Sequence, residues 1–329
     1  MTASAPPTLS VTDLKTHFFT RAGIVKAVDG VSLSVKPGEV LGLVGESGCG
    51  KSITGFSILG LIDPPGRIVS GSIKFKGEEL FGASDERLRA LRGNRIAMIF
   101  QDPMMTLNPV LRIDTQMVET IQAHKKIGRR EALDIARDAL AQTGIPAPEK
   151  RLKTYPHELS GGMRQRVAIA IAFLNKPDLI IADEPTTALD VTIQAQILYE
   201  AQALCAKTGT AMIWISHDLA VVSALADSIA VMYAGRVVES GRADDVIGDA
   251  RHPYTRGLIG SVPSSNRRGQ RLVQIPGMTP SLLNPPPGCA FRTRCAIADA
   301  GCAADPPVVE PAPGHVVRCH KPHVAAAAA

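Results

Sequence analysis

One short stretch of the chain combines residue types and spacing that suit phosphate chemistry. Residues 45–52, with the sequence GESGCGKS, fit the pattern G-x-x-x-x-G-K-[ST] at every fixed position. Glycines let such a loop turn tightly, so that successive backbone N–H groups point at phosphate oxygens. In a loop of this kind Lys51 reaches the β- and γ-phosphates and Ser52 reaches a magnesium ion. The residues expected around a bound nucleoside triphosphate are Gly45, Ser47, Gly48, Cys49, Gly50, Lys51 and Ser52.

A pair of carboxylates could supply the rest of a hydrolytic site. Asp183 and Glu184 directly follow the apolar run 179–182, where the carboxyl edge of a parallel sheet would meet the phosphate loop. Asp183 would hold the magnesium ion directly or through water, and Glu184 would orient and polarise the attacking water. An isolated acidic pair is more often a solvated turn, but a phosphate loop in the same chain favours the catalytic interpretation.

A third candidate lies at residues 159–165, with the sequence LSGGMRQ, just before the helix-like run 167–174. Ser160 could simply cap that helix. The two glycines, Gly161 and Gly162, could equally form an anion-binding nest at its N-terminus. The residues alone leave both interpretations open.

The elements that must position these residues follow from short apolar runs. The run 39–44 predicts a buried strand before the phosphate loop, and 52–61 is compatible with a helix after it. Residues 9–18 and 24–35 predict a first antiparallel layer. The segment 108–158 is mainly helical in pattern, which predicts an inserted helical subdomain. Further strands are expected at 72–75, 96–100, 179–182, 211–215 and 228–233, with a helix at 191–207, so the pattern as a whole predicts an α/β fold with a parallel sheet covered by helices.

The C-terminal part has a different composition. Beyond residue 260 prolines accumulate and apolar periodicity fades, which predicts a small separate unit. Four of the six cysteines lie there, at Cys289, Cys295, Cys302 and Cys319. Four thiolates suit zinc or an iron–sulfur cluster by count, although the wide gaps fit zinc ribbons poorly, and unliganded reduced thiols are the third possibility.

Composition excludes several classes of function. The chain has 329 residues, of which 45% are hydrophobic and 20% charged, and this is ordinary globular usage for two or three structural units. The net charge is only +5 and the basic residues are scattered, so the sequence predicts no nucleic-acid partner. No apolar run approaches the roughly 20 residues of a membrane helix, and the N-terminus lacks the features of a signal peptide, so we expect a cytosolic location.

These motifs, in this order over residues 9–240, resemble ATP-binding cassette (ABC) proteins. The resemblance implies a P-loop ABC nucleotide-binding domain with a RecA-like parallel core, an antiparallel β layer and a helical subdomain at about residues 102–175. It also implies that Ser160, Gly161 and Gly162 belong to the ABC signature, which binds the γ-phosphate of a nucleotide held by the phosphate loop of a second subunit. With Glu184 and His217 both present, it implies a subunit that hydrolyses ATP with Mg²⁺.

The resemblance assigns the remaining nucleotide residues. Gln101 corresponds to the Q-loop glutamine, which touches the magnesium shell and couples to a transmembrane partner. Asp190 ends the D-loop run Ala188-Leu189-Asp190, and His217 corresponds to the switch histidine on the γ-phosphate. Phe18 is the expected adenine-stacking residue, with Phe19 as its competitor.

Further motifs resemble the ATPase subunits of dipeptide and oligopeptide importers. They are residues 100–109 (FQDPMMTLNP), 252–258 (HPYTRGL), 275–277 (IPG) and 285–295 (PPPGCAFRTRC). Met163 stands where the commonest signature has glutamine, but methionine there is similar to this subfamily. The resemblance implies a nucleotide-binding domain at 1–255 and an extension at 256–329, in which the four cysteines hold a [4Fe–4S] cluster, with Zn²⁺ as the alternative.

The implied function is that of an ATP-hydrolysing subunit that energises peptide import, peripheral on the cytoplasmic face of the cell membrane. The implied partners are a second ABC ATPase subunit in a heterodimer, two transmembrane permeases and an extracellular or periplasmic substrate-binding protein. Similar machines carry nickel or glutathione, and the ATPase subunit does not touch the cargo. A soluble non-transport ABC ATPase is less consistent with a single cassette lacking a long coiled coil, and a metal-binding protein with a vestigial nucleotide site conflicts with Glu184.

Overall fold

A computed structural model describes residues 6–186, 190–262 and 274–323, and its backbone contacts divide the chain into two compact units. The first, here called the helical unit, consists mainly of Gly82–Ile213, with Lys36–Gly38 and the described residues before Leu9. The second, the sheet unit, consists of Leu9–Val35, Glu39–Phe81 and the described residues from Trp214 onward. The sequence-based boundary at residue 255 remains a prediction.

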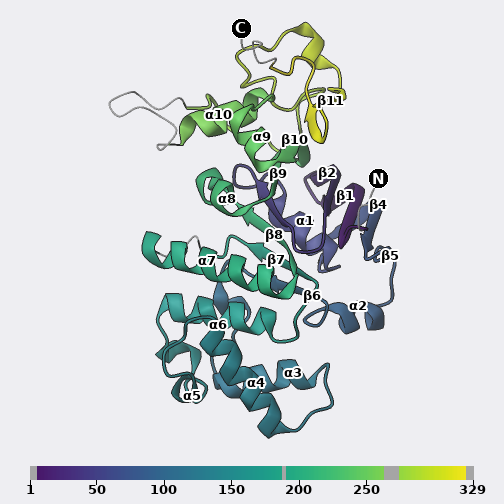
Figure 1. The fold of residues 1–329 in the computed structure, drawn as a ribbon. Coiled ribbons are helices and arrows are strands. Elements are labelled where there is room, and N and C mark those ends of the chain that lie inside the picture. Colours follow the sequence, from purple (N-terminus) through teal and green to yellow (C-terminus); the bar gives the residue numbers. More distant parts are fainter. Residues whose placement is uncertain (1–5, 187–189, 263–273, 324–329) are drawn as a thin grey trace. The chain divides into compact units, whose positions relative to one another are not determined.

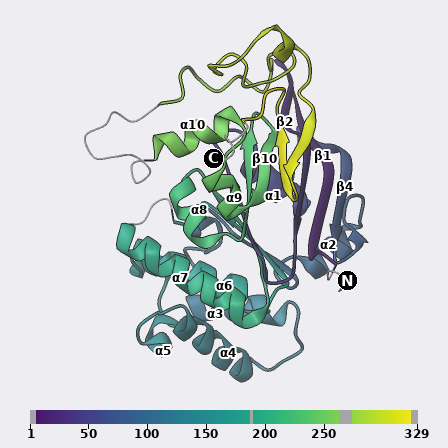
Figure 2. The same ribbon diagram turned by 45° about the horizontal axis from the view of Figure 1, so that its top comes forward.

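The sheet unit contains a four-stranded antiparallel sheet in the order β2-β1-β4-β5. Its strands are β1 (Leu9–Thr20), β2 (Gly23–Val35), β4 (Gly66–Phe75) and β5 (Glu78–Glu79), of which Figure 2 shows β1, β2 and β4 side by side. At the end of β2, buried Val31, Leu33 and Val35 alternate with exposed serines, because successive side chains of a strand point to opposite faces. The expected antiparallel layer is confirmed.

A second sheet of the same unit carries the phosphate loop. Five neighbouring strands of this sheet belong wholly to the unit and follow the order β11-β12-β10-β9-β3, with β3 (Val40–Val44) parallel to β9 (Ser228–Tyr233) and the other pairs antiparallel. All five residues of β3 are buried, as expected for a strand covered on both faces. The unit's α-helices are α1 (Lys51–Ile58), α8 (Leu219–Leu225), α9 (Ala243–Gly248) and α10 (Pro253–Ser261).

The C-terminal residues contribute strands that the sequence did not predict. A hairpin of β11 (Val308–Ala312) and β12 (His315–Arg318) pairs with β10 (Arg236–Arg242), with Glu239 opposite Val317. A short 3-10 helix, η4 (Ala300–Ala303), precedes the hairpin. Residues 308–318 of the proline-rich segment are therefore part of the same sheet as β10.

The helical unit contains two parallel strands, β6 (Ile96–Ile99) and β7 (Leu179–Asp183), with Ile99 opposite Ala182. Strand β8 (Ala211–Ser216) has its first three residues in this unit and its last three in the sheet unit. The helices, several of which are seen together in Figure 1, are α2 (Asp85–Leu91), η1 (Pro103–Met105), α3 (Ile113–Gln122), α4 (Arg129–Gln142), α5 (Pro148–Arg151), η2 (Pro156–Glu158), α6 (Gly161–Phe173) and α7 (Val191–Thr208).

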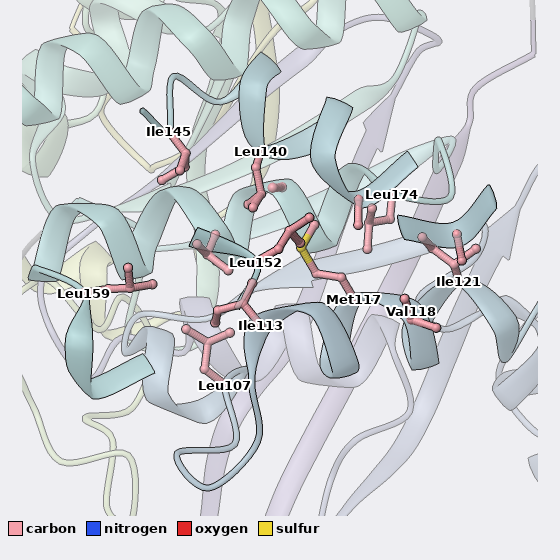
Figure 3. Close-up of a cluster of buried hydrophobic side chains, with 14 residues drawn as sticks. Leu107, Ile113, Met117, Val118, Ile121, Leu140, Ile145, Leu152, Leu159 and Leu174 are labelled. Atoms are coloured by element: carbon pink, nitrogen blue, oxygen red, sulfur yellow. The ribbon is translucent and has the colours of Figure 1, made fainter. Parts of the chain in front are cut away.

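A cluster of buried apolar side chains holds the helices of this unit together (Figure 3). Helix α4 contributes Ala132, Ala136 and Leu140, which share one face because they are four residues apart and which are all fully buried. They pack with residues of α3 and α6, among them Met117 and Val167. The expected helical insert therefore has its own apolar core. Within the parts of the chain that the structure describes, no helix combines the length and apolar character needed to cross a bilayer.

Candidate functional site

The phosphate loop lies between β3 and α1, as its sequence predicts. Gly45, Gly48 and Gly50 have φ of +156°, +77° and +106°, values that glycine adopts without strain. A Cβ on Gly50 would lie 2.2 Å from the carbonyl oxygen of Ala27, so the loop also needs glycine for close backbone packing. The Nζ atom of Lys51 donates to the carbonyl oxygens of Gly45 at 2.8 Å and Glu46 at 3.0 Å, which keeps the ammonium group at the loop.

Two other loop residues, Cys49 and Glu46, are fixed by contacts with residues outside the loop. The carbonyl oxygen of Cys49 accepts from the N–H of Gly235, which follows β9. Burial raises the pKa of the Cys49 thiol, so this side chain fills space as a neutral group. The Glu46 carboxylate pairs with Arg294, and the hydrogen bond from that guanidinium lowers the pKa of Glu46 below its ordinary value.

Two further candidates belong to the sheet unit. His217 is exposed after β8, and the next residue, Asp218, caps α8 by accepting from the N–H groups of Ala220 and Val221. Phe18 is half-buried on β1, where its ring lies in the space that a side chain on Gly66 would occupy. Its competitor Phe19 is more exposed, and the guanidinium of Arg67 covers one face of its ring at 4.2 Å from the centroid. The choice of Phe18 remains a prediction.

The helical unit brings three predicted residues to one edge of its strand pair. Asp183 is the last residue of β7 and is buried, and Glu184 follows it with φ of +45°, an uncommon conformation for a residue with a side chain. Gln101 follows β6, the parallel neighbour of β7, and its Nε2 atom approaches the Glu184 Oε2 atom at 3.5 Å. At this distance the contact is weak, but it places the amide of Gln101, the expected Q-loop residue, beside the expected catalytic carboxylate.

The signature residues begin α6. The Ser160 hydroxyl caps the helix by accepting from the Met163 N–H at 3.3 Å, so the capping interpretation of Ser160 is confirmed. Gly161 and Gly162 form the first turn, with Gly161 exposed, so N–H groups at the start of this 13-residue helix remain suited to an anion. Signature binding of a γ-phosphate remains a prediction.

Asp190, the expected D-loop aspartate, lies near Gly162 of the expected signature. Asp190 caps α7 by accepting from the Ile193 N–H at 3.0 Å. A Cβ on Gly162 would lie 3.2 Å from the Cγ2 atom of the same Ile193, so the first turns of α6 and α7 are in contact. The other two residues of the expected D-loop run, Ala188 and Leu189, lie outside the described residues.

The four C-terminal cysteines line one pocket together with His252 and His320. Burial is the main cause that raises the pKa of Cys319 to about 11, and the neighbouring cysteines contribute to this shift because like charges disfavour the thiolate. The N–H of Cys289 donates to the carbonyl oxygen of Cys302 at 3.0 Å, which joins two of the turns. All four are free thiols, and among the described residues no group of three or more His, Cys, Asp or Glu side chains is arranged to hold a metal ion.

Sequence reasoning missed three residues that contact the phosphate loop. Tyr254, Thr279 and Arg294 all hydrogen-bond Glu46. Tyr254 and Arg294 lie inside the motifs at 252–258 and 285–295, but these motifs indicate no role for them. The pairing of Arg294 with Glu46 spans 248 residues of chain, and no local periodicity signals a contact of that range.

Comparisons with known proteins agree with this geometry. Residues 28–187 match the ABC transporter family, and residues 238–302 match the family described as oligopeptide/dipeptide transporter, C-terminal region. The chain is 50% identical to the dipeptide transport ATP-binding protein DppD of Bacillus subtilis, over 87% of this chain and 86% of that one. It is 47% identical to the oligopeptide transport ATP-binding protein OppD of Escherichia coli, over 95% of this chain and 93% of that one.

Solved structures show the same cassette fold. A dimeric ATP-binding cassette, MJ0796, in a post-hydrolysis state bound to ADP and Pi, has a TM-score of 0.65 and 25% identity, over 71% of this chain and 98% of that chain. The expected α/β cassette fold is confirmed. On the strength of its relatives over almost its whole length, the chain belongs to the ATP-binding proteins of the peptide ABC transporter family.

Proposed function

We propose that this chain hydrolyses ATP to drive the import of dipeptides or oligopeptides through a membrane ABC transporter. The observation that carries the proposal is the folded phosphate loop at the end of β3, in which Lys51 donates to carbonyl oxygens of the loop. The chain that contains this loop is closely similar to peptide transport ATP-binding proteins. The loop N–H groups and Lys51 would bind the phosphates of ATP, with Phe18 against the adenine.

The groups for hydrolysis would come from both units: Gln101, Asp183 and Glu184 belong to the helical unit, and Ser52 and His217 belong to the sheet unit. Glu184 would orient and deprotonate the attacking water, and Gln101, 3.5 Å away, would hold that carboxylate in place. Ser52, Gln101 and Asp183 are oxygen donors that suit Mg²⁺, which would neutralise charge on the phosphates when bound. His217, exposed after β8, would contact the γ-phosphate.

The signature implies that catalysis needs a second cassette. Ser160 and the two glycines at the start of α6 would bind the γ-phosphate of a nucleotide held by the partner's loop. Asp190, near these glycines, would lie at the same interface between the two cassettes. We infer a heterodimer with another ABC ATPase subunit, peripheral on the cytoplasmic face of the membrane and bound to two permeases served by a substrate-binding protein. An isolated chain should then turn over ATP slowly, and full activity in a purified monomer would contradict the composite site.

Replacement of Glu184 by glutamine tests the catalytic assignment. Glu184→Gln should keep ATP binding but lower kcat by about a hundredfold or more, because the water loses its base. Glu119→Gln, an exposed glutamate on α3 in the same unit, is the matched control and should hydrolyse ATP like the wild type. Unchanged hydrolysis in Glu184→Gln would refute the assignment.

The cargo requires a transport measurement. In vesicles that contain the cognate permeases and are supplied with the substrate-binding protein, we expect ATP-dependent uptake of labelled dipeptides and longer peptides. Uptake of nickel or glutathione instead would assign the chain to a related machine, and no coupling to any permease would favour a soluble ABC ATPase.

We also propose that Cys289, Cys295, Cys302 and Cys319 hold a [4Fe–4S] cluster. The support is chemical and not geometric: four free thiols line one pocket and thiolates are the ligands of such clusters, whereas the side chains of the described residues are not grouped around a metal position. The group would fasten turns that bury little apolar surface themselves. Iron, sulfide and visible absorption of anaerobically purified Cys302→Ser should fall below those of the matched variant Cys205→Ser, whereas zinc without iron would replace the cluster with Zn²⁺, and no metal would leave four reduced thiols.

A further inference from the structure

Glu46, the second residue of the phosphate loop, is enclosed by side chains from the C-terminal part of the chain. Its N–H donates to the Tyr254 hydroxyl at 2.9 Å. Its Oε2 atom accepts from the Thr279 hydroxyl at 2.8 Å and from Arg294 Nη1 at 2.6 Å, and its Oε1 atom accepts from Arg294 Nη2 at 2.9 Å. The backbone and both carboxylate oxygens of one loop residue are therefore held by residues more than 200 positions away.

Arg294 is itself fixed in this position. Only 4% of its side chain is exposed, and its Nε atom donates to the carbonyl oxygen of Pro276 at 2.8 Å. Nη1 also lies 3.3 Å from the hydroxyl of Tyr233. A guanidinium that is already immobilised forms a bidentate pair with a carboxylate at little further loss of entropy, and such a pair fixes both distance and orientation.

Aromatic packing makes the support rigid. The rings of Tyr233, Tyr254 and Phe291 pack with centroids 4.5 to 5.4 Å apart. Phe291 lies on the same turn as Arg294, whose N–H donates to the Phe291 carbonyl oxygen at 2.9 Å. This turn also carries Cys289 and Cys295, so the cysteine-bearing segment and the support of the phosphate loop are one structure.

Glu46, which Arg294 holds through its carboxylate, is also a hydrogen-bond partner of Lys51. Lys51 Nζ donates to the carbonyl oxygen of Glu46 at 3.0 Å, and the Cys49 N–H donates to the same oxygen at 3.3 Å. A displacement of Glu46 would therefore move a carbonyl oxygen that orients the lysine and an N–H of the loop. The contacts form a continuous path from the C-terminal turn to the phosphate-binding groups.

We propose that Arg294 is a positioning residue for the phosphate loop: with Thr279 and Tyr254 it fixes Glu46, so that ATP affinity depends on the folded C-terminal segment. The inference rests on the proposed function, because it assumes that residues 45–52 bind ATP. It assigns the C-terminal segment a role in nucleotide binding in addition to its place in the fold.

ATP affinity of the full chain tests this role. With a fluorescent ATP analogue and Mg²⁺, Arg294→Gln and Glu46→Gln should each raise Kd by on the order of tenfold. The double variant should be no weaker than either single variant, because both changes break the same contact. Arg294→Lys keeps the positive charge but cannot form the bidentate pair with Glu46, so its ATP affinity should lie between those of the wild type and Arg294→Gln. Additive single effects, or an unchanged Kd in Arg294→Gln, would overturn the proposal.

Two further variants separate positioning from general stability. Arg251→Gln removes another largely buried arginine of the sheet unit, which binds Asp249 and the carbonyl oxygen of His323, and it should lower Tm with an unchanged ATP Kd. Thr279→Val removes a single hydrogen bond to Glu46 at similar side-chain volume and should raise Kd by about two- to fivefold even if Arg294→Gln does not fold. Equal effects of Arg251→Gln and Thr279→Val on Kd would reduce the contacts to a structural role.

Replacement of Lys51 distinguishes the two proposals. If Lys51→Ala abolishes analogue binding while the variants of Arg294 and Thr279 do not weaken it, the loop is the nucleotide site and only the positioning role fails. If Lys51→Ala binds the analogue like the wild type, the assignment of the loop itself fails.

Discussion

Removal of Arg166 should destabilise the helical unit strongly. Arg166 lies on α6 with 7% of its side chain exposed, and its Nη1 atom donates to Glu200 Oε1 on α7 at 2.7 Å and to the carbonyl oxygen of Thr143 at 2.9 Å. Thr143 is the C-terminal cap of α4, so one guanidinium connects three helices. Glu200 is also nearly buried, with 14% of its side chain exposed, so Arg166→Ala would leave the Glu200 carboxylate without its charged partner, with only a hydrogen bond from Gln196, and would leave the Thr143 carbonyl oxygen without the Arg166 donor.

The expected loss is about 3 to 5 kcal/mol at neutral pH, because an uncompensated charge then remains in the interior. The net contribution of the Arg166–Glu200 ion pair to the free energy of unfolding is much smaller than this loss. Burial raises the pKa of Glu200 above its ordinary value despite the nearby guanidinium, so desolvation outweighs the attraction of Arg166. The double replacement Arg166→Met with Glu200→Leu should therefore be close to neutral, or stabilising by about 1 kcal/mol or more.

Urea unfolding of the full chain measures both changes through the shift of the midpoint at unchanged slope. The sign of the pH dependence provides a second test. A carboxyl whose folded pKa is raised binds more protons in the folded state, so its contribution to stability falls as the pH rises through that pKa. Arg166→Ala should lower the free energy of unfolding less at pH 5 than at pH 8, because the Glu200 carboxyl is more readily protonated, and so neutral, at the lower pH. A loss below about 1 kcal/mol at pH 8, or a double variant as unstable as Arg166→Ala, would refute this account.

Three other changes have expected outcomes. Leu140→Ala in the apolar cluster of Figure 3 should lower the free energy of unfolding by about 3 kcal/mol, measured by urea unfolding, since Leu140 is fully buried; a loss below about 1 kcal/mol would show that the site collapses. Gly50→Ala should weaken binding of a fluorescent ATP analogue at least tenfold, because its Cβ would lie 2.2 Å from the Ala27 carbonyl oxygen and φ is +106°; wild-type affinity would contradict this close packing. Burial raises the pKa of Cys205 to about 12, so Cys205→Ser should show as many rapidly reacting thiols at pH 8 as the wild type, and one fewer would indicate an accessible thiol.

The nucleotide elements could be predicted because their signals are local. The phosphate loop needs glycine at fixed places, and the apolar runs before Gly45 and Asp183 are too short and too apolar for anything but buried strands, which the structure has at β3 and β7. The helix-like run 167–174 corresponds to only the later part of α6. The helix begins at Gly161 despite the low helix propensity of glycine, because the Ser160 cap satisfies an N–H of its first turn.

Other features depend on partners far along the chain. The hairpin of β11 and β12 has mostly exposed residues in its first strand and a proline at position 311, so it lacks the alternation that identifies a strand; pairing with β10 stabilises it. The conformation of Glu184, with φ of +45°, is likewise imposed by its surroundings, since its side chain disfavours that region.

The glycines that make the phosphate loop suitable for an anion also make it costly to order. Gly45, Gly48 and Gly50 lose more conformational freedom on folding than other residues do, and a loop that remained mobile would lose that freedom again on binding ATP. Glu46 offers what the glycines lack, a side chain that a fixed guanidinium can hold, and its own carbonyl oxygen is a partner of Lys51. Support from Arg294 therefore orders the loop before the nucleotide arrives, which explains physically why a segment so distant in sequence contacts a loop whose motif is complete without it.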